Sequence, residues 1–208
     1  MKAAVVLTSL CLALVLSGCT LIDSTLTLKF EPLTGKIAAA PTLVLITRVS
    51  DRRADQRRIG CKKNGLGSES ADLFLNAPLT TWFSSVMKSE LERAGFPPAG
   101  PNDAKTVKLE IDIIDFFIEP DVGMGIRVYA VVNAEVTVRF PDGAAYARRF
   151  AGLSSDSAIV VTDGDYSGQI LTAMSVWVQQ AVGETARLIS THSSAAGVAS
   201  TSAWRVVG

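Results

Sequence analysis

Histidine and cysteine are scarce in this chain of 208 residues. Its single His, His192, leaves little room for His-dependent catalysis, and its 3 Cys exclude a disulfide-rich miniprotein. An excess of charge of one sign is also missing, since 20 Lys plus Arg face 20 Asp plus Glu. DNA binders gain much of their affinity by neutralising phosphates, so this balance argues against nucleic acid as a partner. With 48% hydrophobic residues, the chain is neither collagen-like nor disordered, and its length fits one domain.

The N-terminus has the pattern of an export signal. Met1-Lys2 precede an apolar run from Ala3 to Leu16 that contains no charged residue. At about 14 residues, this run is shorter than the roughly 20 residues that a helix needs to cross a bilayer. A basic start and a short apolar run are typical of a secretory signal peptide. We therefore expect residues 1–18 to be removed.

The apolar run ends in Leu16-Ser17-Gly18-Cys19, which resembles the lipobox of bacterial lipoproteins. This resemblance implies that Cys19 is the mature N-terminus and the lipid attachment site, and that its acyl chains anchor the protein to a membrane. Asp after the acylated Cys usually retains a lipoprotein at the inner membrane, whereas Thr20 occupies that position here. The resemblance thus implies the outer membrane of a Gram-negative bacterium, with the domain facing the periplasm. The alternatives are a signal peptide ending in Cys by chance and an N-terminal membrane helix.

Cys61 has no intramolecular disulfide partner if this processing occurs. Cys11 leaves with the signal peptide and Cys19 carries the lipid. We favour a buried, inert thiol at Cys61, while a mixed or intermolecular disulfide in an oxidising compartment is the alternative.

The remaining sequence predicts one two-layer α+β domain over residues 42–190. A lipidated N-terminus and tether over residues 19–41 precede this domain, and a flexible tail over residues 191–208 follows it. Apolar periodicity predicts the elements in the order β-α-β-β-β-α: a strand at Leu43–Ile46, a helix at Pro78–Ala94, strands at Val107–Ile113, Met124–Phe140 and Ala145–Leu153, and a helix with an apolar stripe over Ile170–Leu188. A mainly antiparallel sheet with both amphipathic helices on one face would bury their apolar stripes together.

Local signals refine this prediction. Gly95 is placed to end the first helix as a left-handed cap residue. Trp82, Phe83 and Trp177 are expected to be core anchors of the two helices. Phe117 and Tyr129 are not assigned to the core, because their positions could fall on the solvated face of a strand.

A basic segment is the candidate for binding an anionic partner. It has seven cations, with only Asp51 and Asp55 between them: Arg48, Arg52, Arg53, Arg57, Arg58, Lys62 and Lys63. Such residues could bind phosphate groups of lipids or lipopolysaccharide, or an acidic protein. The glycine-punctuated part, Gly60 to Gly67, is predicted to be a surface loop. The alternative is a solvated loop, partly neutralised by nearby carboxylates such as Glu69.

No motif for catalysis, a metal or a cofactor stands out. Asp112, Asp115, Glu119 and Asp121 have neither His ligands nor a D-x-D-x-D-G loop beside them. His192 lies in the predicted tail, without a G-x-S-x-G or S-x-x-K context. We therefore expect a protein without enzymatic activity, metal or cofactor.

Several short motifs resemble the YajG-type family of bacterial lipoproteins. Besides the lipobox ending at Cys19, they are Val49-Ser50-Asp51-Arg52-Arg53 with Asp55, Ile59-Gly60 with Lys63-Asn64-Gly65-Leu66-Gly67, Leu91-Glu92-Arg93-Ala94-Gly95-Phe96 and Phe140-Pro141-Asp142-Gly143. The resemblance implies an outer-membrane lipoprotein and supports the expected fold. The leading hypothesis is a non-enzymatic periplasmic interaction module, whose partner is an envelope protein or an anionic glycolipid. The alternative is a lipid or glycolipid carrier in envelope transport.

Overall fold

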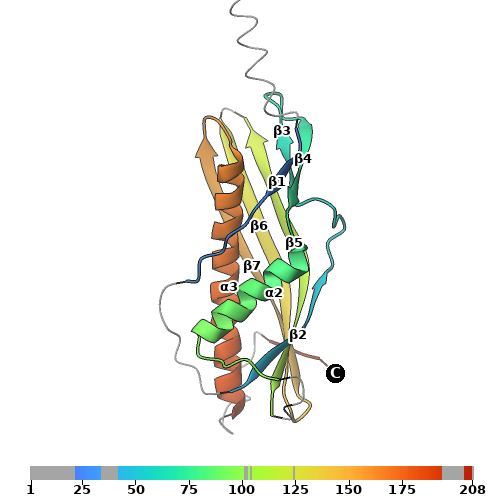
Figure 1. Cartoon of the computed structure of the whole chain (residues 1–208), viewed down its shortest axis with the longest axis vertical. Coiled ribbons are helices and arrows are strands. Elements are labelled where there is room, and N and C mark those ends of the chain that lie inside the picture. The colour runs from blue at the N-terminus through green and yellow to red at the C-terminus, as the bar shows by residue number, and fades with distance from the viewer. Residues whose placement is uncertain are drawn as a thin grey trace, which may run out of the picture.

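The described part of the chain folds into two layers, a sheet of eight strands and two helices packed on one of its faces (Figure 1). The computed structural model describes residues 22–33, 42–100, 103, 105–123, 125–193 and 204–207. The elements, in chain order, are β1 (Ser24–Leu26), β2 (Val44–Asp51), β3 (Gly60–Lys63), β4 (Glu69–Leu75), α2 (Leu79–Arg93), β5 (Val107–Val122), β6 (Ile126–Arg139), β7 (Ala145–Ala158), α3 (Asp163–Ser193) and β8 (Arg205–Val206). The predicted α+β class and its mostly antiparallel sheet are confirmed. The signal peptide and Cys19 lie outside the described residues.

Strand β5 organises the sheet because it has two different neighbours along one edge. The strand order is β1-β4-β3-β5-β6-β7-β8, and β2 also pairs with β5. One edge of β5 pairs with β6 along its length, whereas the other pairs with β2 over Val107–Ile113 and with β3 at Ile118. The β5–β6 register shifts between Ile113 and Asp115, where the β2 pairing ends. Such a shift bends a strand locally and allows this exchange of neighbours.

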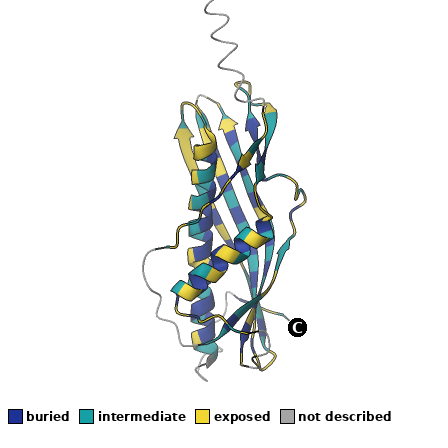
Figure 2. Ribbon diagram, in the orientation of Figure 1, coloured by how far each residue is buried: buried dark blue, intermediate teal, exposed yellow. Residues whose placement is uncertain are grey.

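The sheet is apolar on the face that the helices cover. Figure 2 shows buried residues alternating with less buried ones along β5 and β6. The helix α3 follows the long axis of the sheet, and α2 lies across it on the same side (Figure 1). Phe83 and Trp177, one from each helix, are fully buried, with ring centroids 4.9 Å apart. Both predicted anchors are therefore confirmed, while Trp82 is only partly buried.

Two strands occur where the sequence predicts a loop. β3 and β4 form an antiparallel hairpin, which contradicts the surface loop predicted for the first half of Gly60 to Gly67. A Cβ on Gly60 would lie 1.9 Å from the carbonyl oxygen of Ile118, so β3 needs glycine at this point to pair with β5. This glycine, predicted as loop punctuation, instead permits a close strand contact.

The helix boundaries follow the sequence more closely. Gly95 has φ of 92°, as expected for a left-handed residue that ends α2. The helix α3 has 31 residues and is therefore about 46 Å long. No helix among the described residues is long and apolar enough to span a membrane.

Segments on both sides of the predicted domain pack against it. Leu26 in β1 is 2% exposed and β1 pairs with β4, so residues 24–26 extend the sheet rather than only tether it. In the C-terminal segment, α3 continues through Ser193, Trp204 is buried, and β8 pairs with β7.

Candidate functional site

The seven predicted anion-contacting residues are mostly engaged within the domain. Each forms an ion pair with a carboxylate: Arg48 with Glu110 and Asp112, Arg52 with Asp112, Arg53 with Asp51, Arg57 with Asp55, Arg58 with Asp55, Glu69 and Asp72, Lys62 with Asp163, and Lys63 with Glu119. These pairs fit the alternative interpretation of the sequence, in which nearby carboxylates partly neutralise the segment. The pairs reduce the positive potential available to an external anion.

Arg53 is a buried structural residue. Its guanidinium pairs with both oxygens of Asp51, at 2.8 and 3.0 Å. It also donates to the backbone carbonyl oxygens of Gln56, Arg58 and Phe116, at 2.8–3.3 Å. The side chain therefore holds the β2–β3 connection against β5, and it is not available to a partner.

The other cations do not form one continuous patch. Arg48 faces the start of β5, through Glu110, whereas Lys63 faces its end, through Glu119. Hydrogen bonds from Arg58 to Asp72 and Glu69 raise the pKa of this guanidinium further above its ordinary value. Arg57 is the freest cation of the seven, with a side chain that is 91% exposed.

Cys61 is a buried free thiol, as expected from the sequence. Its side chain is 0% exposed. Loss of solvation raises the pKa of the thiol to about 11, and the nearby carboxylates of Glu69 and Glu119 add to this effect. A protonated thiol without solvent access is a poor nucleophile.

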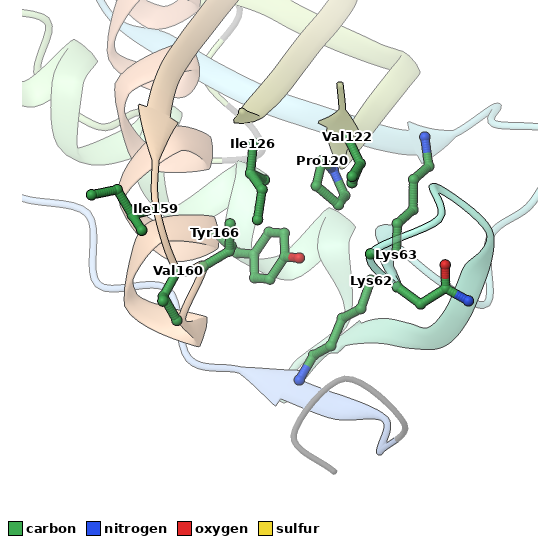
Figure 3. A pocket seen from close by; sticks show the side chains of 11 residues that line it. Lys62, Lys63, Pro120, Val122, Ile126, Ile159, Val160 and Tyr166 are labelled. Carbon is green, nitrogen blue, oxygen red and sulfur yellow. The ribbon is translucent and has the colours of Figure 1, made fainter. Parts of the chain in front are cut away.

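A hollow lies at one end of the sheet, between the β3–β4 hairpin and the start of α3. Its volume is about 240 Å³, and its lining is mainly apolar, with Lys62 and Lys63 at one side (Figure 3). Asn64 and Gly65 of the hairpin also line it. The remaining residues come from β5 and β6 (Pro120, Val122 and Ile126), from the β7–α3 connection (Ile159, Val160 and Val161) and from the first turn of α3 (Tyr166). Burial raises the pKa of Tyr166 to about 12, so its hydroxyl stays neutral.

The sheet face opposite the helices, which we call the outer face, has an apolar row. Phe117 is paired with Val131, and Val131 with Leu153, on adjacent strands β5, β6 and β7. Leu153 is 65% exposed, and Tyr129 beside the row is 37% exposed. We call Phe117, Val131 and Leu153 the outer row. Polar Asp115 and Asn133 border it, joined by a hydrogen bond of 2.8 Å.

The outer row ends at an open strand edge. Among the described residues, β8 pairs only with Tyr146 and Ala147, although β7 continues to Ala158. The outer edge of β7 from Arg148 onward therefore has no strand partner in the part of the chain that the structure describes. Exposed backbone groups at such an edge can pair with another chain.

The sequence pattern does not predict the outer row, although it places Phe117 and Tyr129 outside the assigned core, on what could be the solvated face of a strand. The signal is the alternation of side chains along β5, but its phase changes at the register shift after Ile113. Extending the pattern of Val107–Ile113 would place Phe116 outward, whereas the structure buries it and turns Phe117 outward.

The fold is similar to that of a solved bacterial protein. The crystal structure of protein XCC0632 from Xanthomonas campestris, described as family-model DUF330, matches with a TM-score of 0.59 and 14% identity. The match covers 82% of this chain and 98% of that one. The crystal structure of an uncharacterized protein matches at 13% identity and a TM-score of 0.49, covering 80% of this chain and 99% of that one. No family model and no curated protein matches the chain. The similarity to XCC0632 shows the α+β fold alone.

Proposed function

We propose that the chain is a non-enzymatic lipoprotein of the YajG type that acts as an interaction module in the bacterial envelope. In this proposal, Cys19 carries the acyl chains, the outer membrane holds the anchor, and the domain faces the periplasm. The lipobox and the short YajG-like motifs support the anchor and the family.

The outer row beside the open edge of β7 carries the proposed interaction. Three apolar side chains lie next to one another in the row, with polar residues at its border, which resembles the apolar centre and polar rim of a protein interface. The adjacent edge offers backbone hydrogen bonds to an added strand. A protein partner could thus contact side chains and backbone together, and we favour an envelope protein over an anionic glycolipid because the cations are paired within the domain.

The placement of the reactive side chains supports a non-enzymatic role. Cys61 is buried, and the ring of His192 stacks on Phe140 with centroids 3.7 Å apart. His192 also contacts Asp142 through Nε2, at 2.9 Å.

The anchor has a direct test in the intact mass of the native protein. We expect the mature chain to begin at Cys19 and to carry acyl chains, each buried methylene of which contributes about 0.8 kcal/mol to membrane binding. Cys19→Ala should lose the acyl mass and the cut after residue 18. As a control, residues 1–19 are replaced by an ordinary secretory signal, which should release the domain into the soluble periplasm. A native chain without acyl mass would contradict the anchor.

The interaction has a separate test on the outer face. A photo-crosslinking amino acid at Ser155, next to Leu153 on β7, should capture a specific envelope protein in cells. Leu153→Asp should reduce this capture about tenfold, since loss of an anchor at the centre of an interface costs about 2 kcal/mol or more and about 1.4 kcal/mol corresponds to a tenfold change. The same crosslinker at exposed Gln179 on α3 is the matched control. Equal capture from both positions, or capture that Leu153→Asp leaves unchanged, would contradict the proposal.

A lipid or glycolipid carrier is the second candidate, and the hollow near Tyr166 favours it. Its apolar lining suits a lipid tail, and an anionic headgroup would have to displace the carboxylate partners of the two adjacent lysines. Its volume, about 240 Å³, is below the roughly 300–1,000 Å³ of typical ligand pockets. The interaction module therefore remains the leading proposal, and native mass spectrometry for a co-purifying lipid distinguishes the two.

A further inference from the structure

Four segments meet at one end of the domain, which we call the hairpin end. They are residues 22–24 before and at the start of β1, 62–67 of the β3–β4 hairpin, 120–123 at the end of β5, and 159–163 before and at the start of α3 (upper end in Figure 1). Lys62 joins three of them, because its Nζ donates to Ser24 Oγ at 2.6 Å and pairs with Asp163 at 3.2 Å. The hollow in Figure 3 lies among these segments.

The hairpin end concentrates exposed apolar side chains. Leu66 at the tip of the hairpin is 92% exposed, and Ile159 and Val160 after β7 are 96% and 72% exposed. Ile22, before β1, is 69% exposed. These are four of the seven large hydrophobic residues that are exposed in the described part of the chain. Exposed apolar residues gathered at one end of a domain can mark a contact site for a protein or a membrane.

The position of Cys19 favours a membrane as the occupant. Cys19 precedes Ser24 by five residues, and five residues span at most about 18 Å even when fully extended. An acyl anchor at Cys19 therefore has to keep Ser24, and with it the hairpin end, within about 18 Å of the bilayer surface. The opposite end of β6 lies about 45 Å away along 14 residues, so it is far less constrained.

The charges at the hairpin end indicate whether membrane binding would depend on anionic headgroups or on apolar burial. Lys62 and Lys63 are paired with Asp163 and Glu119, and Asp121 adds a further carboxylate nearby. This end thus offers no excess of positive charge to anionic headgroups. Apolar side chains can still enter the boundary between headgroups and acyl chains, which gains from apolar burial.

We infer that the hairpin end rests on the bilayer, with Leu66, Ile159 and Val160 inserted at the level of the headgroups. This inference rests on the proposed acylation of Cys19. The contact fixes the orientation of the domain, with the long axis of the sheet pointing away from the membrane. It depends on apolar burial and is independent of anionic lipid.

Site-specific labelling of the full acylated chain tests this contact. Introduced Cys residues are well suited to labelling, because Cys61 is buried, Cys19 is acylated and Cys11 is removed in the proposed mature chain. Leu66→Cys and Ile159→Cys, each carrying a polarity-sensitive fluorophore, are reconstituted into phosphatidylcholine vesicles with and without phosphatidylglycerol. Lys105→Cys, an exposed position just before β5 at the opposite end, is the matched control.

We expect the labels at 66 and 159 to brighten about twofold in vesicles, and to be quenched by a lipid-attached quencher, as for side chains buried in the interface. The label at 105 should remain as in water, and phosphatidylglycerol should not change the result.

Vesicle flotation of the same samples reports the anchor independently. If the samples float but the labels at 66 and 159 report an aqueous environment, the inference is overturned while the proposed anchor stands. Absence of flotation overturns the proposed anchor and the inference with it. Label changes in whole envelopes but not in protein-free vesicles assign this end to a protein partner and also overturn the inference.

Discussion

Arg53→Ala is expected to lower the free energy of unfolding by about 3–5 kcal/mol, because removing one member of a buried ion pair leaves the other without compensation. The guanidinium is nearly inaccessible, with 7% of its side chain exposed, and Asp51 is only 13% exposed. Three backbone carbonyl oxygens also lose their donor. Urea denaturation followed by tryptophan fluorescence measures this loss. Backbone amides of the β2–β3 connection should also exchange their hydrogens faster in the variant than in wild type.

Arg57→Ala provides the matched control, since it removes the same side chain from the same segment. Arg57 is exposed and its contact with Asp55 is long, at 3.5 Å, so its stability should stay within about 0.5 kcal/mol of wild type. Arg53→Lys keeps the charge but not the planar set of donors, so it should remain well below wild type. Equal stability of Arg53→Ala and Arg57→Ala would show that the buried network does not hold this segment.

Gly152→Ala is expected to destabilise the protein by about 3 kcal/mol, at the upper end of the usual cost of overpacking. Gly152 lies on β7 where α3 crosses closely. A Cβ there would lie 1.9 Å from the carbonyl oxygen of Ala173 and 2.8 Å from the amide nitrogen of Trp177. Both are backbone atoms, so no side-chain rotation relieves the clash, and the helix has to move off the sheet. Thermal and urea unfolding measure the effect.

The same substitution at Gly183 should act in the opposite direction. Gly183 lies within α3, and a Cβ there would meet nothing within 4 Å apart from its chain neighbours and the backbone of its own helical turns. Because Ala is a better helix former than Gly, Gly183→Ala should stabilise the protein by about 0.5–1 kcal/mol. If both substitutions change stability by the same amount, close packing of α3 on β7 is not what requires glycine at 152.

The elements with strong periodicity could be predicted from the sequence because each makes its own apolar face. The two helices and the β5–β6–β7 meander follow from such local patterns. The β3–β4 hairpin could not be predicted in this way. Gly60 pairs with Ile118 of β5 through backbone contact, and β3, with four residues, is too short to show an alternation of apolar and polar side chains. Only the tertiary contact distinguishes this segment from a loop.

The candidate site was harder to predict because it depends on register. The sequence shows seven cations, but the carboxylate that pairs with Arg48, Glu110, is 62 residues away. Which side chains of β5 face the helices after Ile113 likewise depends on the register shift between β5 and β6, and the residues of β5 alone do not reveal this shift. Composition therefore suggests an anion-binding loop, whereas the assembled sheet shows an apolar row elsewhere.

The length of α3 fixes the distance between the two ends of the domain. A helix of about 46 Å packed along β6 and β7 makes the domain a stiff spacer, because its two long layers cannot shorten independently. If the hairpin end rests at the lipid surface, as inferred above, Leu153 stands about 17 Å above that surface, since it precedes the end of β7 by five residues. In this proposed arrangement, a partner of the outer row would have to reach that height above the membrane, so a protein confined to the headgroup layer would not meet it.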